Sequence, residues 1–354
     1  MNVMTPANPP TGRLRAERVT LAHGGGGKAM RDLIEDVFVA AFRNPEMGEM
    51  EDQARLTSAA LAEPGAQLAF TTDSFVVDPV EFPGGNIGTI AVCGTVNDLA
   101  VGGARPLWLS ASFIIEEGVE VALLRRIAAS MRGAAEEAGV AIVTGDTKVV
   151  GKGSADKLFV TTAGVGVIPP GRSLAASRIR AGDVAIVNGV LGDHGAAILA
   201  ARGDMALTTD IPSDCRSLNG LMETVVAAAP GLRAARDATR GGLASALNEM
   251  AEAAGVGIEI EETALPLRNE VKGVCEILGL DPLYLANEGT LVLFVPAAES
   301  QAALDAMQGH PAGREAKIIG RAVEGHSGTV VMHTLFGGQR IVDMLVGEQL
   351  PRIC

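Results

Sequence analysis

Apolar residues recur along the chain at two spacings, and the change from one to the other predicts where helices and strands lie. From Ala29 to Phe42 they return every three to four residues, which is typical of an amphipathic helix. The segments 87–101 and 119–138 are also predicted to be helices. Strands are predicted where apolar and β-branched residues run together, at 67–74, 106–115, 140–148 and 157–167. This mixed order indicates an α+β or α/β unit and argues against a helical bundle.

A second unit is predicted after Pro169-Pro170-Gly171, which interrupts the pattern and marks a domain boundary. Its helices are expected directly after residue 192 and at 215–229, 243–254 and 300–307. Its strands are expected at 183–188, 258–260, 290–295, 316–322 and 329–335. The chain then divides into a leader with a glycine-rich loop and helix (1–48), a first domain (49–170), a second domain (171–336) and a C-terminal tail (337–354).

Composition limits the class of protein. With 354 residues, 47% of them apolar and 20% charged, the chain suits two globular domains that each bury a core. Its net charge of -13 argues against binding to nucleic acid, whose backbone requires a surplus of Lys and Arg. Apolar runs stay shorter than the ~18 residues that span a bilayer, so no membrane segment is expected.

The four cysteines, Cys93, Cys215, Cys275 and Cys354, are far apart in the sequence and include no Cys-x-x-Cys pair. This spacing favours neither a zinc site nor a disulfide scaffold, and it suits a cytoplasmic protein with reduced thiols. Cys354 is the last residue of a polar tail that opens with two glycines. A thiol there is poorly placed for a core and well placed to be carried on a flexible arm, although a terminal cysteine can also be accidental.

Four consecutive glycines, Gly24, Gly25, Gly26 and Gly27, precede Lys28 at the start of the first predicted helix. Backbone N–H groups in such a turn can converge on an anion, and the helix N-terminus adds a favourable dipole. The spacing of a Walker A loop is absent. The segment therefore predicts contact with phosphate. A flexible glycine hinge is the alternative, and the two are compatible.

Four aspartates, Asp73, Asp98, Asp146 and Asp237, stand at predicted strand ends or in glycine-rich turns. Hard oxygen ligands from several loops are what Mg²⁺ needs to hold a nucleotide triphosphate. Any one of these residues alone is better explained as a turn or helix-cap residue. All four together with the glycine-rich turn favour a metal–phosphate site.

These motifs carry a family resemblance. Four of them resemble the ATP-binding superfamily that includes aminoimidazole ribonucleotide synthetase and selenophosphate synthetase: Thr-Thr-Asp-Ser (71–74), Val-Asn-Asp-Leu-Ala (96–100), Thr-Gly-Asp-Thr-Lys (144–148) and Asp-Ala-Thr-Arg-Gly-Gly (237–242). Within it, four more resemble the HypE family of hydrogenase maturation proteins, the carbamoyl dehydratases: His-Gly-Gly-Gly-Gly-Lys (23–28), Gly-Asp-His-Gly (192–195), Asn-Glu-Gly (287–289) and Pro-Arg-Ile-Cys (351–354). The match covers nearly the whole chain after residue 17.

The resemblance implies an α+β protein with two α/β-sandwich-type domains of the aminoimidazole ribonucleotide synthetase-like fold, a mobile tail, and a homodimer formed by pairing first domains. It also implies a reaction. A carbamoyltransferase partner, HypF, loads a carbamoyl group onto Cys354, and the tail enters the ATP site of the same protein. ATP phosphorylates the carbamoyl oxygen, and loss of a proton and of phosphate leaves a thiocyanate. The cyano group passes to the iron of the nascent nickel–iron hydrogenase centre, on a HypC–HypD complex.

The resemblance assigns roles to residues as well. Mg²⁺ is expected on Asp73, Asp98 and Asp237. ATP is expected to contact Gly24, Gly25, Gly26, Gly27, Lys28, Asp73, Asn97, Asp98, Asp146, Thr147 and Lys148. Besides Cys354, the catalytic candidates are Glu288 and Lys148, followed by His194, whose Gly-Asp-His-Gly turn suits a structural cap equally well.

Three alternative functions fit parts of the pattern. A selenophosphate synthetase-like enzyme typically has a cysteine or selenocysteine near the glycine-rich opening, whereas no cysteine precedes Cys93 here. A purine-pathway synthetase would not need a terminal thiol. A non-catalytic ATP-binding scaffold for metallocentre maturation would not need four acidic loops.

Overall fold

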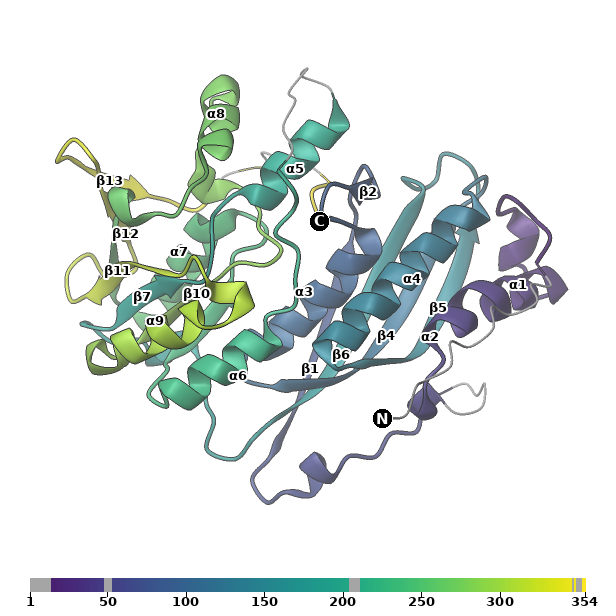
Figure 1. Ribbon diagram of the computed structural model, residues 1–354, viewed down its shortest axis with the longest axis horizontal. Coiled ribbons are helices and arrows are strands. Elements are labelled where there is room, and N and C mark those ends of the chain that lie inside the picture. The colour runs from purple at the N-terminus through teal and green to yellow at the C-terminus, as the bar shows by residue number, and fades with distance from the viewer. Residues whose placement is uncertain (1–13, 48–52, 204–210, 346, 348–351) are drawn as a thin grey trace.

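The computed structural model describes residues 14–47, 53–203, 211–345, 347 and 352–354. The chain forms two halves, each built on a β-sheet that helices cover, and the C-terminus lies between the halves (Figure 1). The predicted mixture of helices and strands is confirmed.

The first half is built on a four-stranded sheet in the order β1-β6-β4-β5. Its strands are β1 (Gln67–Phe75), β4 (Arg105–Glu116), β5 (Ala141–Val150) and β6 (Leu158–Ile168). β4 and β5 run parallel, whereas the other neighbours are antiparallel. Parallel neighbours need a crossover connection, and α4 (Val121–Ala138) supplies it.

One face of this sheet is covered and the other is open. α4 and α3 (Ile87–Val101) lie on the covered face (Figure 1). Side chains alternate along a strand, so β1 directs Leu68 and Phe70 to the open face, where they are 62% and 68% exposed. Ile114 of β4 is 41% exposed on that side. Apolar side chains gathered on one open face are typical of a surface that another protein covers.

The segment after the glycine-rich loop is helical, as predicted, with a change of geometry in its middle. It runs as α1 (Lys28–Leu33), a π-helical stretch (Ile34–Val39) and α2 (Ala40–Phe42). The segment packs beside β5 and β4, where the ring centroids of Phe38 and Phe113 are 4.3 Å apart. π-helical turns inside helices are frequent at functional sites.

The second half contains a seven-stranded sheet in the order β13-β12-β9-β11-β7-β10-β8. Its strands are β7 (Val184–Val187), β8 (Ala234–Asp237), β9 (Gly257–Glu261), β10 (Leu291–Val295), β11 (Lys317–Val323), β12 (Val330–His333) and β13 (Gln339–Val342). Ile186 of β7 packs with residues of α6 (Asn219–Ala228) and α9 (Ser300–Gln308), whereas Val187 packs with residues of α7 (Gly242–Ala254). The central strands are therefore buried on both faces.

The remaining elements are α5 (Asp193–Arg202), α8 (Asn269–Leu278) and a small hairpin of β2 (Glu81–Phe82) and β3 (Gly85–Asn86). Short 3-10 turns lie at Leu21–Gly24, Pro45–Met47, Ala59–Ala62, Ala176–Arg178, Glu262–Ala264, Pro282–Tyr284, Ala297–Glu299 and Pro311–Gly313. Among the described helices, none has both the length and the apolar character needed to cross a membrane.

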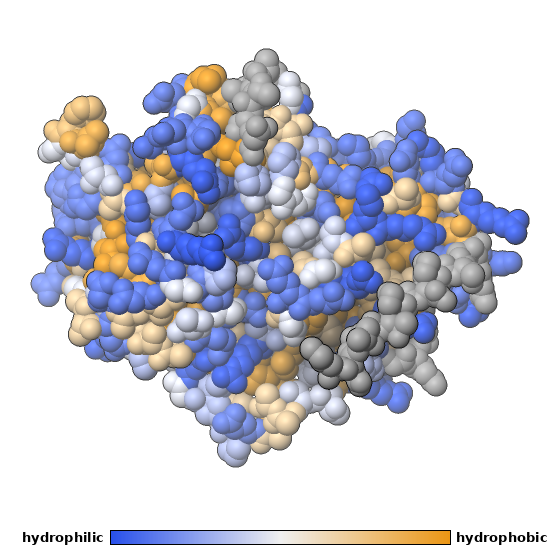
Figure 2. Space-filling view, in the orientation of Figure 1, coloured by the Kyte–Doolittle hydropathy of each residue, from blue (hydrophilic) through white to orange (hydrophobic). Residues whose placement is uncertain are grey.

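Two boundaries differ from the sequence predictions. The helix expected at 215–229 begins at Asn219, because the preceding loop is tied to other segments: the N–H of Leu218 donates to Asn97, and the carboxylate of Asp214 accepts the N–H of Glu288. The expected tail starts later than residue 337, since Gln339–Val342 forms β13 and pairs with β12. The turn between these strands projects at the upper left and is coloured hydrophobic in Figure 2, with Phe336 96% exposed.

Asn97 of α3 joins the two halves. Its side chain is 2% exposed, its Nδ2 atom donates to the carbonyl of Arg216 (3.0 Å), and its Oδ1 atom accepts from the N–H of Leu218 (2.7 Å). Both ends of this amide are engaged within the chain, whereas the predicted contact of Asn97 with ATP stays a prediction. The residue connects α3 to the second half.

Replacing Asn97 by alanine is expected to lower the free energy of unfolding by about 2–4 kcal/mol, because it leaves buried backbone groups of Arg216 and Leu218 unsatisfied. Urea unfolding followed by circular dichroism measures the change. Asn269→Ala, at an exposed position of α8, is the matched control and should shift stability by less than about 0.5 kcal/mol. Equal stability of the two variants would contradict the structural role.

Candidate active site

The last three residues of the chain are held between the two halves (Figure 1). Ile353 is 6% exposed and packs into the core of the first half. The carbonyl of Arg352 accepts hydrogen bonds from Arg202 Nη2 (2.8 Å) and from the N–H of Asp78 (3.2 Å). Arg352 has φ 54°, a left-handed conformation that is uncommon for residues other than glycine. The chain end is thus bound in a defined position.

Glu288 lies on a loop whose backbone is fixed by neighbouring side chains. The carboxylate of Asp214 accepts the N–H groups of Glu288 (2.9 Å) and Gly289 (3.0 Å), and Asn287 Nδ2 donates to the carbonyl of Ala238 (2.8 Å). The Glu288 side chain is 2% exposed, and its Oε2 atom has no hydrogen-bond partner within the described part of the chain. Burial, reinforced by the negative charge of Asp214, raises the pKa of Glu288 well above its usual range.

Cys354 is half-buried, and its thiol lies against the carboxyl group of Glu288. Burial and the charge of Glu288 raise the pKa of this thiol well above its usual range, and Arg240 acts in the opposite direction. The docked cysteine is therefore a protonated thiol at neutral pH. It borders a cavity of about 570 Å³ that Ser74, Arg240 and Tyr284 also line.

Asp73, Asp98 and Asp237 converge from β1, α3 and β8 on the same region. Burial and the charge of Asp237 raise the pKa of Asp98 to about 7, although Thr71 donates a hydrogen bond to its Oδ2 atom (3.0 Å). Burial likewise raises the pKa of Asp237. Arg240 Nη2 lies 3.3 Å from Asp73 Oδ1. The cluster therefore holds more negative charge than its cationic neighbours offset.

These three carboxylates do not surround one point. Within the described residues, no three His, Cys, Asp or Glu side chains lie close enough together to hold a metal ion by themselves. Mg²⁺ commonly uses one or two carboxylates and completes its shell with water and substrate phosphate. The raised pKa values of Asp98 and Asp237, and the unpartnered Oε2 atom of Glu288, fit a site whose charge a cation stabilises.

His194 is at the start of α5 and is completely buried. Its Nε2 atom lies 2.7 Å from the carbonyl oxygen of Ile353, and its Nδ1 atom lies 2.8 Å from Ser213 Oγ. With both ring nitrogens engaged, neither is open to a reacting group in the docked arrangement. In this arrangement the imidazole contacts the chain end, and the role of His194 in proton transfer stays a prediction.

The other predicted site residues lie away from the chain end, on and beside β5. They are Gly24 to Lys28, Asp146, Thr147 and Lys148. Backbone register aligns Ser74 of β1 with Asp146 of β5 across β6 and β4. Three strand spacings separate these edge strands, about 14 Å. Lys28, Asp146 and Lys148 are exposed. Within one chain, Asp73 on β1 and the residues Asp146 and Lys148 on β5 therefore lie at opposite edges of the sheet.

The glycine-rich loop is held against the end of β5. A Cβ atom on Gly24 would lie 2.8 Å from the Cβ atom of Val149 and 2.9 Å from its backbone N, so only glycine fits there. Gly26 has φ 76°. Gly25, Gly26 and Gly27 are exposed, and their backbone leads directly into α1. The loop is a shaped turn with its N–H groups near solvent, as a phosphate-binding turn requires.

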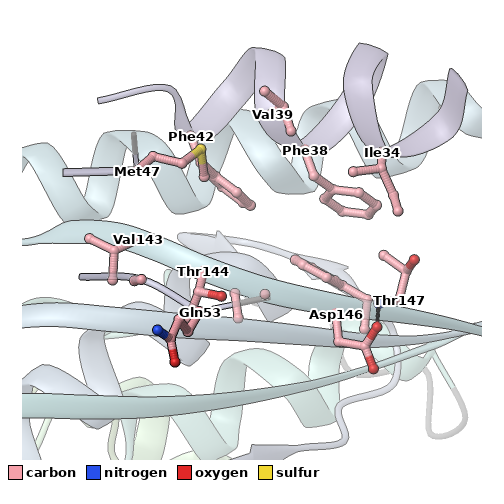
Figure 3. A pocket seen from close by; sticks show the side chains of 14 residues that line it. Ile34, Phe38, Val39, Phe42, Met47, Gln53, Val143, Thr144, Asp146 and Thr147 are labelled. Atoms are coloured by element: carbon pink, nitrogen blue, oxygen red, sulfur yellow. Dashed lines mark hydrogen bonds between the residues drawn. The ribbon is translucent and has the colours of Figure 1, made fainter. Parts of the chain in front are cut away.

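A cavity of about 150 Å³ separates the helical segment 28–42 from β5 (Figure 3). Phe38 and Phe42 point into it from the helix, and Thr147 points into it from the strand. The Thr147 side chain is 6% exposed and its Oγ1 atom has no hydrogen-bond partner among the residues described. An apolar cavity with an unused polar group is typical of a small-molecule site.

Sequence reasoning missed three residues that shape the site. Asp214 and Ser213 belong to a loop without a recognisable pattern, and Arg240 was noted only as part of a motif. All four cysteines are free, and Cys93 and Cys275 are buried, which agrees with the absence of a disulfide scaffold from the sequence prediction.

Comparisons with known proteins agree on one family. Residues 51–168 match the family described as AIR synthase related protein, N-terminal domain, and residues 180–333 match its C-terminal domain. Carbamoyl dehydratase HypE of Rhodobacter capsulatus is 76% identical over 341 residues, covering 96% of this chain and 99% of that protein.

Two solved structures are similar over most of the chain. The hydrogenase maturation protein HypE in complex with ATP has a TM-score of 0.89 and 46% identity, covering 94% of this chain and 99% of that one. A HypE–HypF complex has a TM-score of 0.76 and 46% identity, covering 88% and 99%. The predicted two-domain α+β fold of the AIR synthase type is confirmed.

Replacing Asp98 by asparagine is expected to stabilise the protein in the absence of nucleotide. The amide still accepts the Thr71 hydrogen bond and removes a buried charge. The pKa of Asp98 in the folded protein is about 7, above the usual 3.8 of an aspartate, so ionised Asp98 costs stability at high pH and little near pH 4. The gain should be about 1–4 kcal/mol at pH 8 and smaller at pH 5.

Chemical unfolding at both pH values measures this gain. Asp305→Asn, on the exposed side of α9, is the control and should change stability by less than about 0.5 kcal/mol. A gain that is absent at pH 8, or larger at pH 5, would contradict the argument.

Proposed function

The chain belongs to the HypE family of carbamoyl dehydratases, which act in hydrogenase maturation, and we propose that its own Cys354 carries the carbamoyl group that it dehydrates. The observation that carries this proposal is the docked chain end. The thiol of the last residue lies against the buried carboxyl group of Glu288, beside the cluster of Asp73, Asp98 and Asp237. A synthetase acting on a free small molecule needs no such contact.

The docked position suits a Cys354 sulfur that already carries the carbamoyl group, and it does not suit transfer of that group onto the thiol. The nucleophile in carbamoyl transfer is a thiolate, and the docked position raises the pKa of Cys354. Loading therefore takes place with the tail released, in the active site of a carbamoyltransferase of the HypF type, the partner in the complex formed by a relative. The residues after Val342 are sufficient for this movement, since 12 extended residues reach about 40 Å.

The reaction consumes ATP, the nucleotide bound by a relative. The carbamoyl oxygen attacks the γ-phosphorus and ADP leaves, so the oxygen becomes part of a good leaving group. The nitrogen then loses its protons, the C–O bond breaks, and phosphate departs from a thiocyanate on Cys354. Glu288 is the residue placed to take a proton beside the sulfur, since burial raises its pKa and makes its carboxylate a stronger base. Lys148 offers a second proton-transfer group and a cation for phosphate.

Mg²⁺ would be held by Asp73, Asp98 and Asp237 together with the phosphates. It would neutralise the charge that develops on the transferred phosphoryl group. The glycine-rich turn and Lys28 offer N–H groups and a cation to the triphosphate, and the cavity beside Thr147 offers an apolar seat for the nucleotide base.

A homodimer would unite the two groups of site residues. Pairing of the open sheet faces would cover Leu68 and Phe70, and would bring Lys148 of one chain toward Asp98 of its partner. The cyano group would then pass to an iron-carrying HypC–HypD complex. Four free thiols suit the reducing cytoplasm as the compartment.

Mass spectrometry of the C-terminal peptide tests the carrier role of Cys354. After incubation with the carbamoyltransferase, carbamoyl phosphate and ATP, the peptide should gain about 43 mass units and, on dehydration, lose about 18. Cys354→Ala should bind ATP with unchanged affinity and form neither product, whereas Cys275→Ala should form both. Carbamoyl-dependent ATP hydrolysis by Cys354→Ala would contradict the proposal, and a phosphorylated small-molecule product would support a synthetase instead.

Mixing two inactive variants tests whether the site spans two chains. Asp98→Asn and Lys148→Ala should each lower the rate of thiocyanate formation by about a hundredfold or more. Mixed dimers would contain one intact site, so the mixture should recover about a quarter of wild-type activity. Native mass spectrometry verifies that mixed dimers form. If they form and the mixture stays as inactive as its components, the site lies within one chain.

A further inference from the structure

Hydrogen bonds to its backbone hold the chain end in place, and His194 makes the buried one of them. A carbonyl oxygen only accepts hydrogen bonds, so the Nε2 atom of His194, 2.7 Å from the Ile353 oxygen, must carry a hydrogen. The imidazole is completely buried, and burial lowers its pKa, so it is neutral at physiological pH. Its Nδ1 atom is then an acceptor.

Ser213 fixes this tautomer from the other side. Its Oγ atom lies 2.8 Å from His194 Nδ1 and accepts the N–H of Cys215 (3.1 Å), so its hydroxyl hydrogen is free to point at the imidazole. Phe82 contacts the ring edge-on, with centroids 5.5 Å apart. The direction of donation is therefore set: Ser213 donates to His194, and His194 donates to Ile353.

The carbonyl group that His194 binds belongs to Ile353, the residue directly before the reacting cysteine. Ile353 buries its side chain, and the next residue brings its thiol to Glu288. When the tail leaves, the Nε2 hydrogen of His194 and the apolar seat of Ile353 both lose their partners. Both losses favour return of the tail.

We propose that His194, oriented by Ser213, is a positioning residue that recognises the backbone of the docked tail and holds the loaded Cys354 at Glu288 during dehydration. The inference rests on the proposed carrier role of Cys354. It differs from a role in proton transfer, because the imidazole acts on the Ile353 carbonyl and never on the carbamoyl group. It also predicts that loss of the contact slows dehydration without slowing loading, since dehydration requires the docked tail and loading requires the released one.

Two measurements on the full-length protein separate these roles. The first is the alkylation rate of Cys354 by iodoacetamide, read by peptide mass spectrometry, with buried Cys275 as the internal reference. The second is the conversion of preloaded S-carbamoyl-Cys354 to thiocyanate at saturating ATP. His194→Ala should raise the alkylation rate about tenfold, the factor for one lost hydrogen bond of ordinary strength. It should lower kcat for dehydration, leave the KM for ATP unchanged, and not slow loading by the carbamoyltransferase.

Conservative and control variants sharpen the test. A glutamine amide can donate near the position of Nε2, so His194→Gln should restore most of the docking and of the dehydration rate. Ser213→Ala leaves the ring in place without its orienting hydroxyl and should shift both measurements in the same direction by a smaller factor. It replaces His194→Ala if that variant fails to fold, which thermal melting reports. His310→Ala, at a half-buried histidine that caps another turn, should change neither measurement.

Loss of dehydration with unchanged alkylation of Cys354 would overturn the proposal and assign His194 to the chemistry. Unchanged values for both measurements in His194→Ala would also overturn it. If wild-type protein loads Cys354 but forms no thiocyanate, the proposed function fails, whereas the alkylation measurement still decides whether His194 holds the tail.

Discussion

The structure depends on keeping one carboxyl group, that of Glu288, buried and only partly satisfied. A buried carboxyl group without full hydrogen bonding costs stability, so the surrounding chain must hold it there. Asp214 binds two successive N–H groups of the Glu288 loop, and Asn97 connects α3 to the carbonyl of Arg216 nearby. These contacts use backbone groups and leave the Glu288 carboxyl for the tail. The second half of the chain thus holds the carboxyl group of Glu288 beside the thiol of Cys354.

The same constraint explains why the site lies between the two halves. Asp73 and Asp98 come from the first half, whereas Asp237 and Glu288 come from the second. Mutual repulsion of these carboxylates would drive the halves apart if they were held by charge alone. Neutral contacts therefore contribute to the joining, through the amide of Asn97 and the burial of Ile353. Ion pairs also cross between the halves, among them Arg240–Asp73 (3.3 Å) and Arg105–Glu223 (3.2 Å). Charge is concentrated where substrate and cation would offset it.

Much of this arrangement was predictable from the sequence, and the exceptions have physical reasons. Apolar spacing gave the helix at 87–101 with the correct ends, because its buried positions recur without interruption. Family motifs contain Asp73, Asp98 and Asp237, which the structure brings into one region. Motifs do not reveal which way a side chain points, so they do not show that the Asn97 amide faces the second half. Nor do they reveal distance, and Asp146 stands on the opposite edge strand from Asp73.

In the proposed carrier cycle, the docked site would favour a neutral sulfur over a thiolate. A thiolate is excluded from the docked position, because burial beside Glu288 disfavours a second negative charge. A carbamoylated sulfur has no proton to lose, so its docking does not depend on thiol ionisation, and the same holds for the thiocyanate. The hydrogen bonds to the carbonyl groups of Arg352 and Ile353 do not involve the sulfur, so they form whatever group the sulfur carries. The docked position therefore disfavours the thiolate alone, whereas the carbonyl contacts bind the neutral thiol, the carbamoylated sulfur and the thiocyanate alike.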